Sequence, residues 1–456
     1  MNRTTKILLT IGGIIVLTYP GIAWVAGIAI ESRIQQNEQQ LLKQVPYLTL
    51  VKREYHRGVY RSTETATYAW RNPALQAMNP GGAGALLASF TLTIMSSIQH
   101  GPFPGLHAAA LAVVDSTIVT PPALQQQLTG VLGSKPLLQV HSVVGLFGGA
   151  TSTLTSPAFS VRLSDGSTLA WGGFTGTVTA TRNQARWSGQ FDLPRAAFEG
   201  AQGGLELVGV EYSGSHQKAF GDMYLGTGTF TMERLDGTSP RIGGDYSLQR
   251  ISLTTTSKAD GDFFDMRVDA AMDAAKVKSV QLQNVLYSES FEHVHGPSFD
   301  SMVKAIRAAQ LQAGADHAQA QAGIQSALRQ YGVELLVRDP VLDIRQISFA
   351  MPEGSFVLSG RISAPGLSRA DLQWPAAIMA LKTHAQVTAD LRVDNGLLQK
   401  LLATGGSNPN LAARLTSLEQ QGYLTAGPSA VATHLEYSAG RLTLNSRPFP
   451  PAPPVN

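Results

Sequence analysis

The feature of this sequence that most constrains its fold is an alternation of apolar and polar residues with a period of two. It is clearest where Phe264, Met266, Val268, Ala270 and Met272 alternate with Asp265, Arg267, Asp269, Ala271 and Asp273. This period places apolar side chains on one face of a β-strand. Weaker runs occur at residues 59–70, 90–98, 160–162, 175–181, 186–191, 205–212, 223–232, 280–287, 342–349, 355–362, 385–393 and 434–444. The chain is therefore predicted to be mainly β.

Short turn segments separate many of these runs. They are Ser164-Asp165-Gly166-Ser167, Asp236-Gly237, Asp260-Gly261 and Ser438-Ala439-Gly440. Such sequences suit tight hairpins. The strands predicted at residues 262–273 and 277–287 are so close in the chain that only a hairpin can join them. We therefore expect long antiparallel meander sheets.

Helices are predicted in a few inserted segments, which makes the fold α+β by count. Residues 301–331 are rich in Ala and Gln with few β-branched residues, and predict one or two helices. Residues 397–403 and 411–421 predict a helical pair. Residues 108–130 predict a further helical region, interrupted at Pro121-Pro122.

An uncharged apolar segment, Ile7 to Ile30, predicts a transmembrane helix. Its length as a helix, about 36 Å, exceeds the roughly 30 Å of a hydrocarbon core. Arg3 and Lys6 precede it, which places the N-terminus in the cytoplasm. A cleaved signal peptide is the alternative, because residues 23–26 and 26–29 offer small residues at a cleavage position. Both interpretations export the body, and the uncleaved anchor, which is the leading interpretation, predicts a single-pass protein of a bacterial inner membrane with its bulk in the periplasm.

The whole chain is predicted to divide into segments where the residue pattern and composition change. Residues 1–30 would be the cytoplasmic N-terminus and anchor, 31–46 a helical linker, 47–300 a β-rich body, 301–331 a helical insert, 332–447 a second β-rich part with short helices, and 448–456 a Pro-rich tail.

Composition excludes several kinds of site. The chain has no cysteine, which excludes disulfides, thiolate zinc sites and a cysteine nucleophile. Its net charge of +3 is scattered, so nucleic acid is not an expected partner. It contains neither a phosphate-binding loop nor a dinucleotide fingerprint, and no cofactor is expected.

Two motifs stand near predicted strand ends. His56-Arg57-Gly58 predicts a tight turn in which glycine allows a positive φ or a close backbone approach. The alternative is that His56 and Arg57 contact an anionic lipid headgroup. His100-Gly101-Pro102-Phe103-Pro104 predicts a shaped exit from a strand, since proline cannot donate a backbone hydrogen bond. As the alternative, His100, Gly101, Pro102 and Phe103 are candidate binding residues together with His56, Arg57 and Gly58. His295-Gly296-Pro297 repeats the second motif faintly.

Tyr55-His56-Arg57-Gly58-Val59-Tyr60-Arg61-Ser62, followed by residues 100–104, resembles the hallmark stretches of the YdgA-like family of bacterial envelope proteins. Arg338-Asp339-Pro340 and the closing segment 435–445 are also similar to that family, although Ser446 stands where the family commonly has glycine. The resemblance implies an inner-membrane anchor, a periplasmic body and no established molecular function. It transfers no catalytic residues.

The leading hypothesis is a non-enzymatic envelope protein whose curved antiparallel sheet binds a lipid or protein partner, or associates with a second copy through exposed strand edges. The rival hypothesis is a periplasmic hydrolase or metal-dependent enzyme using His293 and His295, which lie two apart in a predicted strand, or His56.

Overall fold

The structure is a computed structural model that describes residues 3–45, 47–72, 89–106, 109–119, 128–163, 165–201, 203–239, 243–313, 317–373, 375–404 and 410–449. The chain forms two compact units. Unit 1 comprises residues 1–204 and 211–215, and unit 2 comprises residues 205–210 and 216–456. Strand β11 (Gly203–Lys218) contributes residues to both units.

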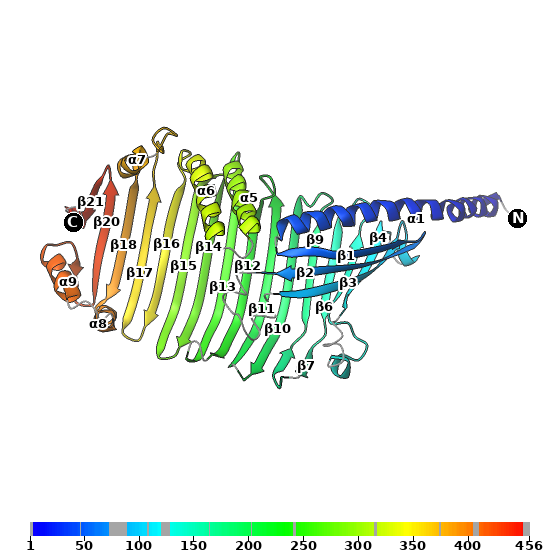
Figure 1. Cartoon of the computed structure of the whole chain (residues 1–456), viewed down its shortest axis with the longest axis horizontal. Coiled ribbons are helices and arrows are strands. Elements are labelled where there is room, and N and C mark those ends of the chain that lie inside the picture. The colour runs from blue at the N-terminus through cyan, green and yellow to red at the C-terminus, as the bar shows by residue number, and fades with distance from the viewer. Residues whose placement is uncertain are drawn as a thin grey trace. The chain divides into compact units, whose positions relative to one another are not determined.

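Unit 1 is an antiparallel sheet with a long helix along it, α1 (Arg3–Gln44) (Figure 1). Its strands are β1 (Leu48–Arg57), β2 (Arg61–Arg71), β3 (Ser89–His100), β4 (Ala112–Val119), β5 (Gln139–Val144), β6 (Ala150–Ser156), β7 (Phe159–Arg162), β8 (Thr168–Trp171), β9 (Phe174–Ala180) and β10 (Arg186–Gly200). Strands β1 to β6 pair in sequence order, and the ladder continues β6–β9–β10–β8–β7. A short 3₁₀ helix, η1 (Pro104–Leu106), follows β3.

Unit 2 is the predicted meander. Its strands are β12 (Tyr224–Ser239), β13 (Gly244–Asp260), β14 (Phe263–Val277), β15 (Val280–His295), β16 (Val341–Met351), β17 (Gly354–Ser363), β18 (Gln386–Asp394), β19 (Thr425–Ala426), β20 (Ala430–Ser438), β21 (Arg441–Leu444) and β22 (Arg447–Pro448). Strands β12 to β18 pair in sequence order, and β18 then pairs with β20. The antiparallel, mainly β fold predicted from the alternation is confirmed.

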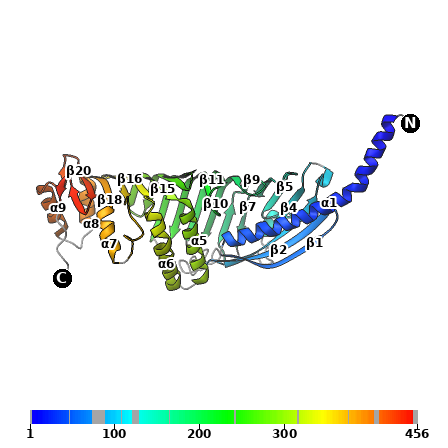
Figure 2. The ribbon, with the colours of Figure 1, turned by 90° about the horizontal axis from the view of Figure 1, so that it is seen from above.

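The helices of unit 2 lie in the connections between its strands. They are α5 (Gly296–Ala313), α6 (His317–Leu336), α7 (Ala376–His384), α8 (Asn395–Thr404) and α9 (Asn410–Gln420). Figure 2 shows α5 and α6 side by side. The predicted helices at 301–331, 397–403 and 411–421 are therefore confirmed, whereas α7 was missed. Within the described part of the chain, no helix is both long and apolar enough to cross a bilayer.

Two local predictions are wrong. Asp236-Gly237 is not a turn but lies within β12, with Gly237 opposite Tyr246 of β13. A Cβ on Gly237 would lie 2.2 Å from the Tyr246 ring, so glycine lets that ring lie against the strand backbone. In the predicted helical region at 108–130, residues Ala112–Val119 form strand β4, where β-branched side chains favour an extended backbone, and of its described residues only 128–130 are helical. Pro121-Pro122 lies outside the described residues.

Candidate functional site

The structure brings the two predicted motifs together at one end of unit 1, around the buried side chain of His100. The His100 Nδ1 atom lies 2.9 Å from the carbonyl oxygen of Val59, and Nε2 lies 2.9 Å from the hydroxyl of Ser62. A carbonyl only accepts, so we assign the ring proton to Nδ1, and the Ser62 hydroxyl then donates to Nε2. His100 therefore joins the end of β3 to the β1–β2 hairpin.

The backbone around His100 is close-packed. A Cβ on Gly58 would lie 2.4 Å from the Arg61 carbonyl oxygen, and one on Gly101 would lie 2.0 Å from that of Ala110. The Pro102 carbonyl accepts a hydrogen bond from the Ala110 amide at 3.0 Å. Both glycines are thus required by close approach, which is one of the two reasons the sequence offered for Gly58.

Helix α1 packs onto the same place. A Cβ on Gly27 would lie 2.5 Å from the His100 Cε1 atom. The imidazole therefore contacts α1 at a glycine, where the helix has no side chain. Ile30, 2% exposed, packs with Ile98 and Ala112 of the sheet. The predicted linker at 31–46 is helical as far as Gln44, and part of the predicted membrane segment is packed on the sheet of unit 1.

Arg57 is held by α1. Its Nε donates to the Glu31 carboxylate at 2.9 Å, and its guanidinium lies 5.5 Å from the centre of the Trp24 ring. His56 is exposed, and its backbone is opposite Thr63 of β2. Arg57 thus has a role in attaching the helix.

A second polar cluster lies further along α1. The Arg53 Nε donates to Glu64 at 2.6 Å, and a guanidinium nitrogen lies 3.5 Å from the Glu38 carboxylate. The Tyr68 hydroxyl donates to Glu38 at 2.5 Å. Burial raises the pKa of Glu64 more than the neighbouring Arg53 lowers it, and burial with the adjacent Glu38 raises the pKa of Tyr68.

Exposed apolar side chains surround the point where α1 meets this end of unit 1. We call them the apolar collar: Ile22, Val25, Val59, Tyr60 and Phe103. The Tyr19 hydroxyl donates to the Phe103 carbonyl at 2.9 Å, and the Tyr19 and Tyr60 rings stack with centres 5.8 Å apart. The collar thus joins the helix, the β1–β2 hairpin and the segment after β3.

His293 and His295 lie in unit 2 and flank one aromatic ring. The His293 ring stacks on Phe263 at 3.9 Å between centres, whereas His295 meets the edge of that ring at 5.5 Å. His295 Nδ1 lies 2.7 Å from the Ser298 hydroxyl, and burial lowers the pKa of His295. Among the described residues, no three histidine or carboxylate side chains gather as metal ligands.

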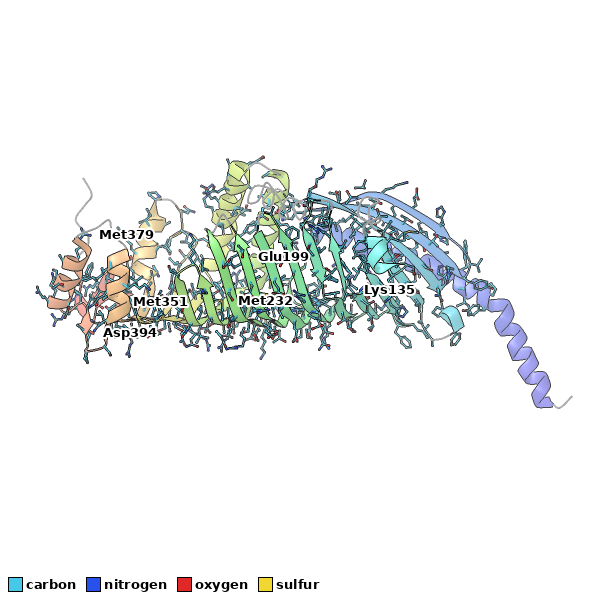
Figure 3. The ribbon with its side chains drawn as sticks, turned by 90° about the horizontal axis from the view of Figure 1, so that it is seen from below. Lys135, Glu199, Met232, Met351, Met379 and Asp394 are labelled. Atoms are coloured by element: carbon cyan, nitrogen blue, oxygen red, sulfur yellow. The ribbon has the colours of Figure 1, made fainter. Side chains whose placement is uncertain are left out.

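Unit 2 carries an apolar row on the kind of one-sided apolar sheet face that the alternation predicts. The paired strands β12 to β18 each place one residue in register on the same face. This apolar row consists of Phe230, Leu253, Ala270, Tyr287, Ile347, Leu358 and Leu391. Leu253 and Tyr287 are 38% and 36% exposed. Met232, labelled in Figure 3, begins a second row on this face that includes Ile251, Met272 and Val285.

The two faces of this sheet differ in character. The opposite face of β14 carries Asp265, Arg267, Asp269 and Asp273, with an ion pair of 2.7 Å between Arg267 and Asp269. On the apolar face, Phe299 of α5 and Leu335 of α6 pack with Phe264 and Met266. The apolar row lies outside this cluster. Its residue in β14, Ala270, is two positions after Val268.

These features define a class of protein: a mainly β, antiparallel chain whose N-terminal helix packs on the strands of unit 1 and whose unit 2 is an amphipathic meander. The chain belongs to a family described as bacterial protein of unknown function (DUF945), whose model matches residues 1–452. The expected membership of a bacterial family without a defined function is confirmed. No curated protein and no solved structure matches the chain.

Proposed function

We propose that this protein is a non-enzymatic, membrane-anchored envelope protein of the YdgA-like kind that holds lipid acyl chains on the apolar row of unit 2. The apolar row is the observation that carries the proposal. Contiguous apolar residues on seven consecutive strands, with charges on the opposite face, are typical of a binding surface.

Hydrogen bonding favours an acyl chain over a peptide as the occupant. Strands β13 to β17 pair on both sides, so their backbone groups are largely used within the sheet. A peptide lying flat on the row would bury its own amide groups without partners, at about 1–3 kcal/mol each. An acyl chain has no such groups and needs only apolar contact.

The proposed anchor is α1, in a bacterial inner membrane with the N-terminus cytoplasmic and the body periplasmic. Support comes from the uncharged run at residues 7–30 and from the apolar collar, where aromatic side chains suit a membrane interface. Ala23, Ala26 and Ile30 are buried in unit 1, so only the outward side of α1 beyond residue 20 can face lipid.

The test is lipid extraction and mass spectrometry on the full chain, purified from membranes in mild detergent. We expect at least one stoichiometric lipid in the wild type and its loss in Leu253→Glu, which places a charge in the apolar row. Thr256→Glu is the matched control, because Thr256 is exposed on the opposite face, opposite Arg267.

Two results would overturn the proposal. One is equal lipid content in folded wild type and folded Leu253→Glu, with folding checked by circular dichroism. The other is a lipid-free oligomer in the wild type, which would move the function to self-association.

A further inference from the structure

A separate cavity of about 460 Å³ lies within unit 1, between α1 and the sheet. Its volume is in the range of small-molecule sites. Ile30 and Ile34 of α1, together with Val114 and Val144 of the strands, form its apolar part. The turn between β9 and β10 closes one side, where the Gln184 amide donates to the Asn37 side chain at 2.8 Å.

Two arginines line this cavity at Gly148. A Cβ built on Gly148 would lie 2.8 Å from both terminal guanidinium nitrogens of Arg33 and 2.9 Å from Cγ of Arg182. No aspartate or glutamate is among the residues that line the cavity. In the described part of the chain, neither arginine has an ion-pair partner, in contrast to Arg53 and Arg57.

We propose that this cavity binds an anionic amphiphile, with its phosphate or carboxylate between Arg33 and Arg182 and its first apolar segment against Ile30, Ile34, Val114 and Val144. Guanidinium groups match such oxyanions with paired hydrogen bonds. An anion would also relieve the repulsion between two positive charges that share one cavity. This site stands on its own observations and does not depend on the apolar row.

The experiment measures lipid binding to the full chain in neutral detergent by native mass spectrometry. It uses the Leu253→Glu background, so that the apolar row does not contribute. The probes are phosphatidylglycerol, phosphatidylcholine with the same acyl chains, and inorganic phosphate. We expect phosphatidylglycerol to bind at least tenfold more tightly than either of the others, because only it supplies both a net negative headgroup and an apolar segment.

The variant R33Q/R182Q should lose at least tenfold in phosphatidylglycerol affinity. The matched control is R71Q/R162Q, which removes two exposed arginines of unit 1 that do not line the cavity, and it should bind like its parent. Equal loss in both double variants would overturn the site, since the effect would then follow net charge alone.

A second variant tests the apolar part. Ala150→Leu adds volume at a residue that lines the cavity, and it should weaken phosphatidylglycerol but leave inorganic phosphate unchanged. If inorganic phosphate binds the parent as tightly as phosphatidylglycerol does, the ligand is a free anion and the amphiphile is wrong. Failure of the apolar row would instead appear as equal lipid content in the wild type and Leu253→Glu, whereas failure of the cavity would appear as equal phosphatidylglycerol affinity in R33Q/R182Q and its parent, so the two proposals fail separately.

Discussion

At the scale of single residues, the most consequential group is the carboxyl of Glu64. One guanidinium, that of Arg53, serves both Glu64 and Glu38, and all three side chains are largely buried. Burial raises the pKa of Glu64, and the nearby Glu38 carboxylate raises it further. The single cation, Arg53, lowers this pKa but does not offset both effects. The Glu64 carboxyl therefore keeps its proton to a higher pH in the folded chain than in the unfolded chain.

The raised pKa sets a direction for stability against pH. Because the folded-state pKa of Glu64 lies above its ordinary value of 4.5, its contribution is fully present below pH 4.5 and is lost as pH rises through the raised pKa. We expect Glu64→Gln to remove this fall, whose slope is at most about 1.4 kcal/mol per pH unit. Thermal unfolding midpoints across this window measure it. Glu211→Gln, an exposed carboxylate of unit 1, should keep the wild-type slope. A Glu64→Gln slope equal to the wild-type slope would contradict the prediction.

At the scale of elements, the attachment of α1 depends on a glycine. Gly27→Ala forces a Cβ against the His100 ring, and such overpacking costs about 1–3 kcal/mol. We expect lower thermal stability and faster proteolysis of α1 in detergent. Gly21→Ala is the matched control within the same helix: its Cβ would meet nothing within 4 Å, and alanine should stabilise the helix by up to about 1 kcal/mol. If both variants shift stability alike, the close contact with His100 has no energetic role.

The sequence predicted features that depend on neighbouring residues better than features that depend on residues far apart in the chain. Alternation predicted β14 because the burial of each side chain follows from its neighbours along the strand. The same local signals misread Gly237, whose role depends on Tyr246 in the paired strand, and although they predicted an apolar face they did not show which residues meet across the strands. Irregular register between β15 and β16, at Gln283 and Leu286, decides which residues share that row. Such pairing cannot be deduced from one strand at a time.

The motifs of the candidate site were found in the sequence, but their contacts were not. His100 and Gly58 stood out as residues of special backbone positions, yet the partners of His100 come from separate parts of the chain: Val59 from the β1–β2 turn, Ser62 from β2 and Gly27 from α1. Likewise, Arg33 and Arg182 line the same cavity only because α1 lies against the sheet. Long-range packing is the information that a single sequence withholds.

At the scale of the whole molecule, the proposed anchor constrains the position of unit 1 at a membrane. Residues 7–18 precede the packed part of α1 and would span only about 18 Å as a helix, less than the roughly 30 Å of a hydrocarbon core. For the anchor to cross the whole membrane, the outward side of α1 and the apolar collar must then also lie in the membrane interface.

A labelling experiment tests this position. Since the chain lacks cysteine, Phe103→Cys provides a unique site for an environment-sensitive dye in reconstituted proteoliposomes. We expect quenching by lipid-borne quenchers at Phe103→Cys and none at Lys135→Cys, an exposed residue outside the collar that is labelled in Figure 3. Equal quenching at the two positions would show that the collar has no preferred contact with lipid.

The regular pairing of unit 2 also sets a length. From β12 to β18 the apolar row crosses six gaps between strands. At about 4.8 Å per gap the row measures about 29 Å, close to the thickness of the hydrocarbon core of a bilayer. That core is filled by two acyl chains end to end. The row is therefore long enough for two extended acyl chains placed end to end, so the two chains of a diacyl lipid need not lie side by side on it.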